Sequence, residues 1–94
     1  MITYRAMYKY LDDGVHAEVL DFPGVISCGS DLSEARRLLR SALADMAETS
    51  IQNGEPLPVP AAGMSDPESD LEEPIHLILQ AATVVVELPQ DAPA

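Results

Sequence analysis

The sequence predicts an α+β fold, in which a small antiparallel sheet of three or four strands carries one long helix on one face. Three observations support this class. Residues 2–10 alternate between apolar and polar side chains, as a half-buried strand does. Asp13-Gly14 is a hairpin signal that turns the chain into a second alternating segment, residues 15–20. Residues 32–53 then repeat apolar side chains at helical spacing. The expected order of elements is β-β-β-α-β.

The first two predicted strands have one face of each suited to a core. In the first strand, the tyrosines suit a pleated surface. In the second, His16 and Glu18 fall on the face that we expect to meet solvent. The predicted core-facing residues of both strands are Ile2, Tyr4, Ala6, Tyr8, Tyr10, Val15, Ala17 and Val19.

A turn at Pro23-Gly24 leads into a third short strand, residues 25–28, because proline fixes φ and glycine accepts the next position of a type II turn. Cys28 ends this apolar strand and is the single cysteine of the chain, so no internal disulfide can form. We expect its side chain to be buried as a small hydrophobe.

The predicted helix has signals at both ends. Gly29 frees the backbone after the third strand, and Asp31 is placed to cap the helix with Glu34 reaching back in a capping box. Gly54 supplies the stop after Asn53. The apolar stripe comprises Leu32, Ala35, Leu38, Leu39, Ala42, Leu43, Met46 and Ile51.

The chain after the helix divides into two further parts. Residues 1–60 form the predicted β-β-β-α core and end in a proline-rich extended segment. Residues 61–74 are acidic, bear proline and glycine, and are predicted to be a linker or long loop. Residues 75–94 begin with a long run rich in branched apolar side chains, 75–88, and end in a frayed tail. We expect this run to complete the sheet as a strand or to form an oligomer interface.

Charge limits the possible partners. Five basic residues face sixteen acidic ones in a chain of 94 residues, which gives a net charge of −11. This balance opposes direct binding to nucleic acid and favours a basic partner. The longest apolar run, residues 81–86, is too short for a membrane span, and the N-terminus lacks a secretory pattern. We therefore expect a cytoplasmic protein with no membrane contact.

The sequence offers little for catalysis. His16 and His76 lack neighbouring ligands at metal-binding spacing, so no metal or cofactor is expected. A Cys28–His16 nucleophile pair is conceivable but has no evident third group. The carboxylates nearest the sheet could serve a two-metal nuclease, although turns and a bend explain most of them. They are Asp12, Asp13, Glu18 and Asp21. An anion site at the helix start is disfavoured because Asp31 would occupy those amides.

Three arginines form a local basic patch on the predicted helix. Arg36 and Arg40 lie one turn apart, and Arg37 is adjacent. Pairing with acids such as Glu34, or cover for the apolar stripe, explains this patch better than a dedicated contact.

Taken in order, the turn, helix and proline segment resemble the HicB family of antitoxins. The pattern is an acidic residue, an apolar residue, Pro-Gly, a short strand, Gly, a helix cap, Glu-Ala in a leucine-rich helix, then Gly and alternating prolines. The resemblance covers residues 2–60. The matching positions are Asp21, Pro23, Gly24, Gly29, Asp31, Glu34, Ala35, Ala42, Leu43, Gly54, Pro56, Pro58 and Pro60.

The resemblance implies a degenerate RNase H-like domain without catalytic function. Such proteins bind a small basic toxin, HicA, which cleaves RNA, and block its active site. Many also carry a C-terminal DNA-binding segment. Residues 61–94 contain no Lys or Arg, so this sequence resembles a short form without an evident DNA-binding C-terminus.

Three hypotheses for function remain after these observations. The first is a non-catalytic antitoxin-like protein that occludes a small basic HicA-like ribonuclease. The second is a solitary HicB-like oligomeric domain with another partner, and the third is a carboxylate-based nuclease or hydrolase. In each of the first two we expect a homo-oligomer. For the first, the predicted contacts are the helix, the proline-rich segment and the acidic residues Glu48, Glu55, Asp66, Glu68, Asp70, Glu72 and Glu73.

Overall fold

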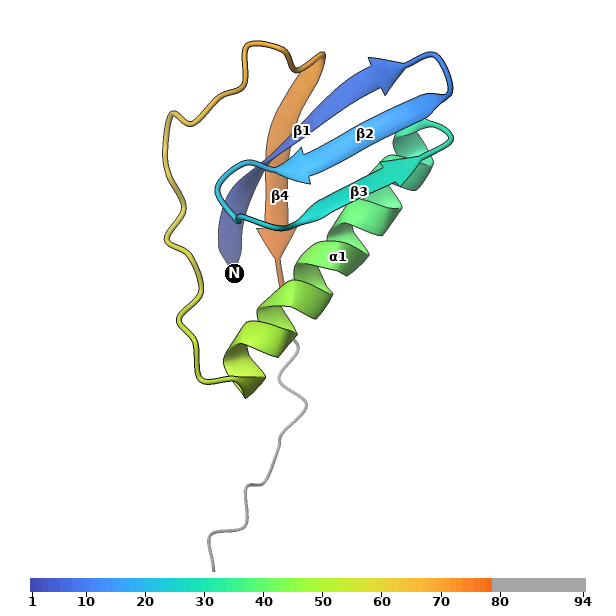
Figure 1. Ribbon diagram of the computed structural model, residues 1–94. Coiled ribbons are helices and arrows are strands. Elements are labelled where there is room, and N and C mark those ends of the chain that lie inside the picture. Colours follow the sequence, from blue (N-terminus) through green and yellow to red (C-terminus); the bar gives the residue numbers. More distant parts are fainter. Residues whose placement is uncertain (79–94) are drawn as a thin grey trace, which may run out of the picture.

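One helix lies across one face of a four-stranded antiparallel sheet, which confirms the predicted class (Figure 1). The computed structural model describes residues 1–78. The strand order in the sheet is β3-β2-β1-β4, so the first strand is central and the last pairs beside it. The elements are β1 (Ile2–Leu11), β2 (Gly14–Val19), β3 (Ile26–Gly29), α1 (Leu32–Gln52) and β4 (Leu71–Leu77).

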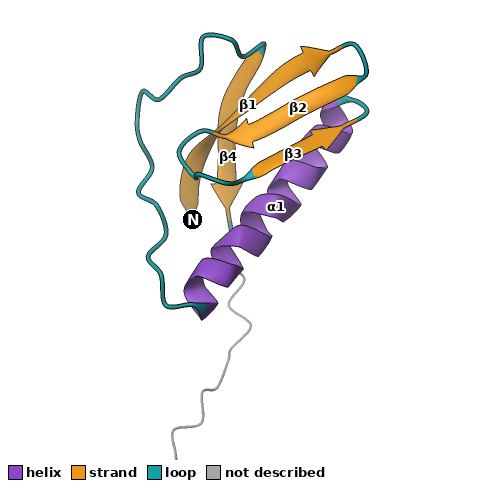
Figure 2. Ribbon diagram, viewed as in Figure 1, coloured by secondary structure: helices purple, strands orange, loops and turns teal. Residues whose placement is uncertain are grey.

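The core lies between α1 and the sheet face toward it, the inner face (Figure 2). The sheet contributes Tyr4, Ala6, Tyr8, Val15, Ala17, Val19, Ile75 and Leu77, and α1 buries Ala35, Leu39, Leu43 and Ala47. The predicted faces of the first two strands are therefore confirmed, except that Tyr10 is 51% exposed at the hairpin end. Ile51 was predicted in the helical stripe but is also 51% exposed, because it lies about 80° further round the helix than Leu43.

Both predicted helix signals form as expected. The Asp31 Oδ1 atom accepts the amide of Glu34 at 2.8 Å, and Glu34 reaches back to the amide of Ser30 at 3.0 Å. At the other end Gly54 has φ +69°, and its amide donates to the Ile51 carbonyl. The helix ends at Gln52, one residue before the predicted end.

Cys28 is exposed, and the prediction that it is buried is wrong. It lies opposite His16 in the register between β3 and β2, on the sheet face away from α1, which we call the outer face. The prediction failed because a continuous apolar run suggests a strand that is buried on both faces. In fact α1 covers only the inner face, so Val25 is buried whereas Ile26 and Cys28 are exposed.

Residues 53–70 form a long connection, the strap, that joins the end of α1 to the start of β4. It contacts the inner side first, where the Tyr4 hydroxyl donates to the Pro58 carbonyl at 2.7 Å. It then reaches the outer face, where Ser65 and Ser69 donate to Glu72, which lies opposite Met7. Met7 is only 3% exposed although it points away from α1, on the face that the strap reaches.

The last described strand begins four residues earlier than predicted. β4 starts at Leu71, within the segment 61–74 that the sequence predicted as linker or loop. The charged pair Glu72-Glu73 and Pro74 are poor strand formers, which concealed the strand. They are accommodated because Glu72 pairs with Arg5 and Glu73 with Arg36, and because Pro74 lies on an edge strand.

The predicted strand 75–88 is described only in part. Its beginning, up to Leu77, belongs to β4 and completes the sheet beside β1. From residue 79 on, that run and the predicted frayed tail lie outside the described residues. Within residues 1–78, no helix has the length and apolar character needed to cross a bilayer.

Candidate functional site

Most basic side chains of the described chain are engaged with carboxylates. Four of the five form ion pairs, and each pair links elements that are distant in sequence except one within α1. The pairs are Arg5–Glu72 at 2.7 Å, Lys9–Glu68 at 3.4 Å, Arg36–Glu73 at 2.8 Å and Arg37–Glu34 at 4.0 Å. Since acids outnumber bases about threefold, this pairing leaves a surplus of exposed carboxylates.

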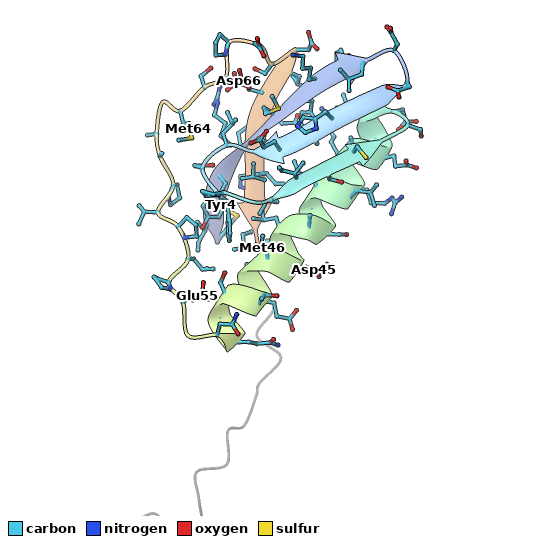
Figure 3. All side chains as sticks on the ribbon, in the orientation of Figure 1. Tyr4, Asp45, Met46, Glu55, Met64 and Asp66 are labelled. Carbon is cyan, nitrogen blue, oxygen red and sulfur yellow. The ribbon has the colours of Figure 1, made fainter. Side chains whose placement is uncertain are left out.

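The predicted contact acids do not form one cluster. Glu48 and Glu55 lie at the C-terminal end of α1 and the start of the strap, and both are exposed. Asp66, Glu68 and Asp70 lie at the other end of the strap, where it enters β4. Figure 3 shows Glu55 and Asp66 at opposite ends of the strap. The structure therefore separates the predicted acids into two groups.

Glu72 is a structural carboxylate on the outer face. Its Oε1 atom accepts Arg5 Nε at 2.7 Å, and its Oε2 atom accepts the hydroxyls of Ser65 and Ser69, each at 2.7 Å. These hydrogen bonds, Arg5 first, lower the pKa of Glu72 to about 2. With its side chain 13% exposed, Glu72 is poorly placed for a partner.

Glu73 is also engaged, on the inner side of β4. Arg36 binds it in a bidentate pair, with Nε and Nη2 each 2.8 Å from a carboxylate oxygen. The same guanidinium lies 5.9 Å from the ring centroid of Tyr8. The hydrogen bond from Arg36 lowers the pKa of Glu73. Burial is the main cause that raises the pKa of Tyr8 to about 12, and the hydrogen bond with Glu73 is the second cause. This cluster fastens α1 to β4.

The acids near the end of the strap hold its backbone in place, and their side chains stay at least partly exposed to solvent. Asp66 Oδ1 accepts the amide of Glu68 at 2.9 Å, which closes a local turn. Asp70 Oδ2 accepts the amide of Tyr10 at 2.7 Å at the end of β1. Glu68 itself is exposed and 3.4 Å from Lys9.

Asp21 has a role that the sequence did not reveal. The sequence placed it in the bend before Phe22, yet it is 7% exposed and joins three segments. Its Oδ1 atom accepts the amide of Arg5 at 2.8 Å, and its Oδ2 atom accepts the amide of Ala61 at 3.1 Å. Two signals were available, namely its place in the HicB-like pattern and its position directly between the apolar residues Leu20 and Phe22.

The glycines of the same motif are required by close approach or by positive φ. Gly24 follows the exposed Pro23 and has φ +93°. At Gly29, a Cβ would lie 2.5 Å from the backbone nitrogen of Ala35, so the start of α1 packs directly on β3. These residues position the helix and act as scaffold.

Side chains capable of catalysis are few in residues 1–78. No group of three or more His, Cys, Asp or Glu side chains there is arranged to hold a metal ion. His16 Nε2 lies 3.5 Å from Glu18, and His76 Nδ1 lies 2.9 Å from the Thr3 hydroxyl. A shallow groove of about 260 Å³ runs beside α1 and β4, lined by Tyr8, Arg40, Glu73, Pro74, Ile75, His76 and Ile78.

Comparison with known proteins finds related folds. The model of the UPF0150-like family matches residues 4–58. The chain is similar to the antitoxin HicB of Burkholderia pseudomallei, with a TM-score of 0.72 and 22% identity over 95% of this chain and 76% of that one. The N-terminal domain of the same antitoxin matches with a TM-score of 0.67 and 21% identity, over 83% of this chain and 100% of that one.

A third similar structure is the HicA3 and HicB3 toxin-antitoxin complex, with a TM-score of 0.54 and 21% identity over 70% of this chain and 73% of the matched one. No curated protein matches the chain. At these identities the solved structures establish the fold. They confirm the resemblance to HicB proteins that the sequence predicted, as a likeness of fold.

Proposed function

This chain belongs to the UPF0150-like family, and from that membership and its fold we propose that it is a non-catalytic antitoxin-like protein. In this proposal it binds a small basic ribonuclease toxin of the HicA type and occludes it. The observation that carries the proposal is the likeness to an antitoxin fold over nearly the whole chain. The HicA3 and HicB3 complex shows that a protein of this fold occurs in a toxin-antitoxin assembly.

The distribution of charge supports a basic partner. The net charge is −11, and four of the five basic residues already pair with carboxylates of the same chain. Exposed acids such as Asp45, Glu48 and Glu55 form no ion pair within residues 1–78 and can meet an incoming basic surface. Complementary charge accelerates association and disfavours wrong partners. Occlusion would combine this attraction with the bulk of the domain.

The predicted acids that hold the domain together have a different role in this proposal. Glu72 and Glu73 are committed to Arg5 and Arg36, so we assign them to the scaffold. We keep Glu48, Glu55, Asp66, Glu68 and Asp70 as the proposed partner contacts. We also propose that the protein forms a homo-oligomer in solution.

The test is inhibition of a defined toxin. The probe is the small basic HicA-type protein encoded beside the gene for this chain, purified and assayed on RNA. We expect RNA cleavage to stop at equimolar protein, and the inhibition to weaken as salt rises. Absence of such a neighbouring protein, or undiminished cleavage in excess of this chain, would refute the antitoxin role and favour the solitary-domain hypothesis.

Two controls sharpen this test. Metal-dependent RNA cleavage by this chain alone, lost on changing Glu18 to Gln, would support the nuclease hypothesis instead. Inhibition that is the same at low and high salt would remove the electrostatic part of the proposal and leave the steric part.

A further inference from the structure

The strand β3 has a backbone edge without a partner strand among the described residues. It forms one margin of the sheet, since the order is β3-β2-β1-β4 (Figure 1). The other margin is β4. In an antiparallel pair, alternate residues direct both backbone groups toward the neighbouring strand, and the residues between them direct theirs away.

The hydrogen bonds fix which residues of β3 point outward. The amide of Val19 donates to the carbonyl of Val25 at 3.0 Å. By alternation, Ser27 and Gly29 bond to Ala17 and Val15 of β2. Ile26 and Cys28 lie between them, so their amides and carbonyls point away from β2. Beyond them, the amide of Ser30 is already taken by Glu34. The open edge therefore offers two donors and two acceptors.

The β4 edge differs because it is protected. Arg5 directs its backbone to the β2 side, where its carbonyl accepts Leu20 and its amide donates to Asp21. Tyr4, Ala6 and Tyr8 therefore bond to β4, and the outward residues of β4 are Glu72, Pro74 and His76. Pro74 has no amide proton, so it interrupts the row of donors in the middle. Proline on an edge strand is a common protection against unwanted pairing.

Apart from the short length of the strand, β3 lacks such protection among residues 1–78. The segment Ile26–Gly29 contains no proline and no charged residue. Its side chains are accessible, with Ile26 54% exposed and Cys28 exposed. Since natural edge strands are blunted by charge, proline or a covering element, an open edge of this kind is a site for strand addition.

Carboxylates surround this uncharged edge. Glu18 lies directly opposite Ile26 on the outer face, and Asp31 follows the end of the strand. A second copy would bring the same acids together at a net charge of −11 each. Charge therefore selects a basic partner strand.

We propose that the free edge of β3 is the docking site for an extended strand of the basic partner. The strand adds to the sheet through the backbone groups of Ile26 and Cys28, with basic side chains near Glu18 and Asp31. This inference rests on the proposed function for the class of partner, a HicA-type protein. It goes further by assigning the contact to backbone pairing at β3.

Amide hydrogen exchange measured by NMR on the full chain tests the backbone pairing. In the free protein, we expect the amides of Ile26 and Cys28 to exchange rapidly and that of Ser27 to be protected. The probe is the neighbouring HicA-type protein in a catalytically inactive form. In the complex, Ile26 and Cys28 should become protected by at least about tenfold, because each gains a hydrogen bond.

A matched pair of charge substitutions tests the same edge by affinity. Ile26→Lys places a cation on β3, and His76→Lys places one on the outer face of β4. We expect Ile26→Lys to weaken binding of the HicA-type protein by about tenfold or more, through like-charge contact at the interface. His76→Lys should leave the Kd within about twofold, and thermal unfolding of both variants confirms that they fold.

The outcomes separate the two proposals. A complex that forms while Ile26 and Cys28 still exchange freely overturns docking at β3 and leaves the antitoxin role intact. A failure to form any complex overturns the proposed function itself. It also removes the HicA-type protein as the partner that docks at β3. If protection of these amides increases with the concentration of this chain alone, the occupant of the β3 edge is a second copy of the chain. That result would overturn docking of a basic partner there.

Discussion

The guanidinium of Arg36 and the carboxylate of Glu73 join α1 to β4 through two parallel hydrogen bonds of 2.8 Å. This pair matters because α1 lies mainly beneath β3 and β2, so few other contacts tie the helix to the edge strand β4. Its geometry depends on the planar fork of arginine, which lysine cannot reproduce.

Replacing Arg36 by lysine should therefore lower stability although the charge is retained. We expect a small but measurable loss in the free energy of unfolding, because the pair is partly exposed and solvent screens it. Urea denaturation measures it. The control is Arg37→Lys, whose partner Glu34 is 4.0 Å away at an exposed site, and this variant should match the wild type. Equal losses in both variants would contradict a special role for the bidentate pair.

Removal of the Asp21 carboxylate should destabilise the domain more strongly. Asp21→Ala leaves the amides of Arg5 and Ala61 without their acceptor, and we expect a cost of about 2–3 kcal/mol. Asp45→Ala, on the exposed surface of α1, should change stability by less than about 0.5 kcal/mol. Chemical denaturation compares the two, and a tolerated Asp21→Ala would show that the strap is held by other contacts.

The pH dependence of stability should contain a contribution from Glu72. Its folded pKa of about 2 lies below the ordinary value of 4.5, so the stabilisation is present above pH 4.5 and is lost as pH falls toward 2. Glu72→Gln should flatten the stability profile within this window. Arg5→Gln removes the largest cause of the shift and should reduce the same contribution. Parallel profiles for wild type and Glu72→Gln between pH 5 and 2 would contradict the assignment.

A methyl group at Gly29 should separate α1 from β3. In Gly29→Ala the added Cβ would meet the Ala35 backbone nitrogen at 2.5 Å, so one element must shift. We expect a loss of about 1–3 kcal/mol, as for other overpacked sites. Thermal unfolding measures it, with Cys28→Ala as the neighbouring control because that side chain is exposed. A Tm unchanged by Gly29→Ala would mean that the helix start adjusts freely.

The homo-oligomer can be tested directly. Multi-angle light scattering at micromolar concentration should give a mass that is a multiple of 10.1 kDa. A single species of 10.1 kDa throughout the range would refute the oligomer.

Local sequence signals predicted most of the fold. The hairpin signal, the Asp31 cap and the Gly54 stop each act over a few residues, and all three elements form. The hairpin loop is Asp12-Asp13, one residue before the predicted Asp13-Gly14, because Gly14 pairs with Leu11 as the first residue of β2. Each signal depends on interactions between residues that are close in sequence, and not on contacts with distant segments. For that reason the three first strands and the helix were predicted with boundaries that differ from the structure by one residue.

Features that depend on distant segments escaped prediction. The start of β4 among Glu72-Glu73-Pro74 becomes favourable only when Arg5 and Arg36 are placed beside it. The exposure of Cys28 follows from which sheet face α1 covers. Among the predicted site acids, Glu72 and Glu73 stabilise the scaffold, whereas acids such as Glu55 are exposed. The sequence could not distinguish these two groups, because it shows only that each residue carries a negative charge.

The strand order also has a consequence during synthesis on the ribosome. β1 is made first, yet its second neighbour β4 is made last, after α1 and the strap. One side of β1 therefore stays unpaired until residues 71–77 have left the exit tunnel. Before that point, β2, β3 and α1 can already assemble on the other side. The nascent chain carries an open strand through this interval.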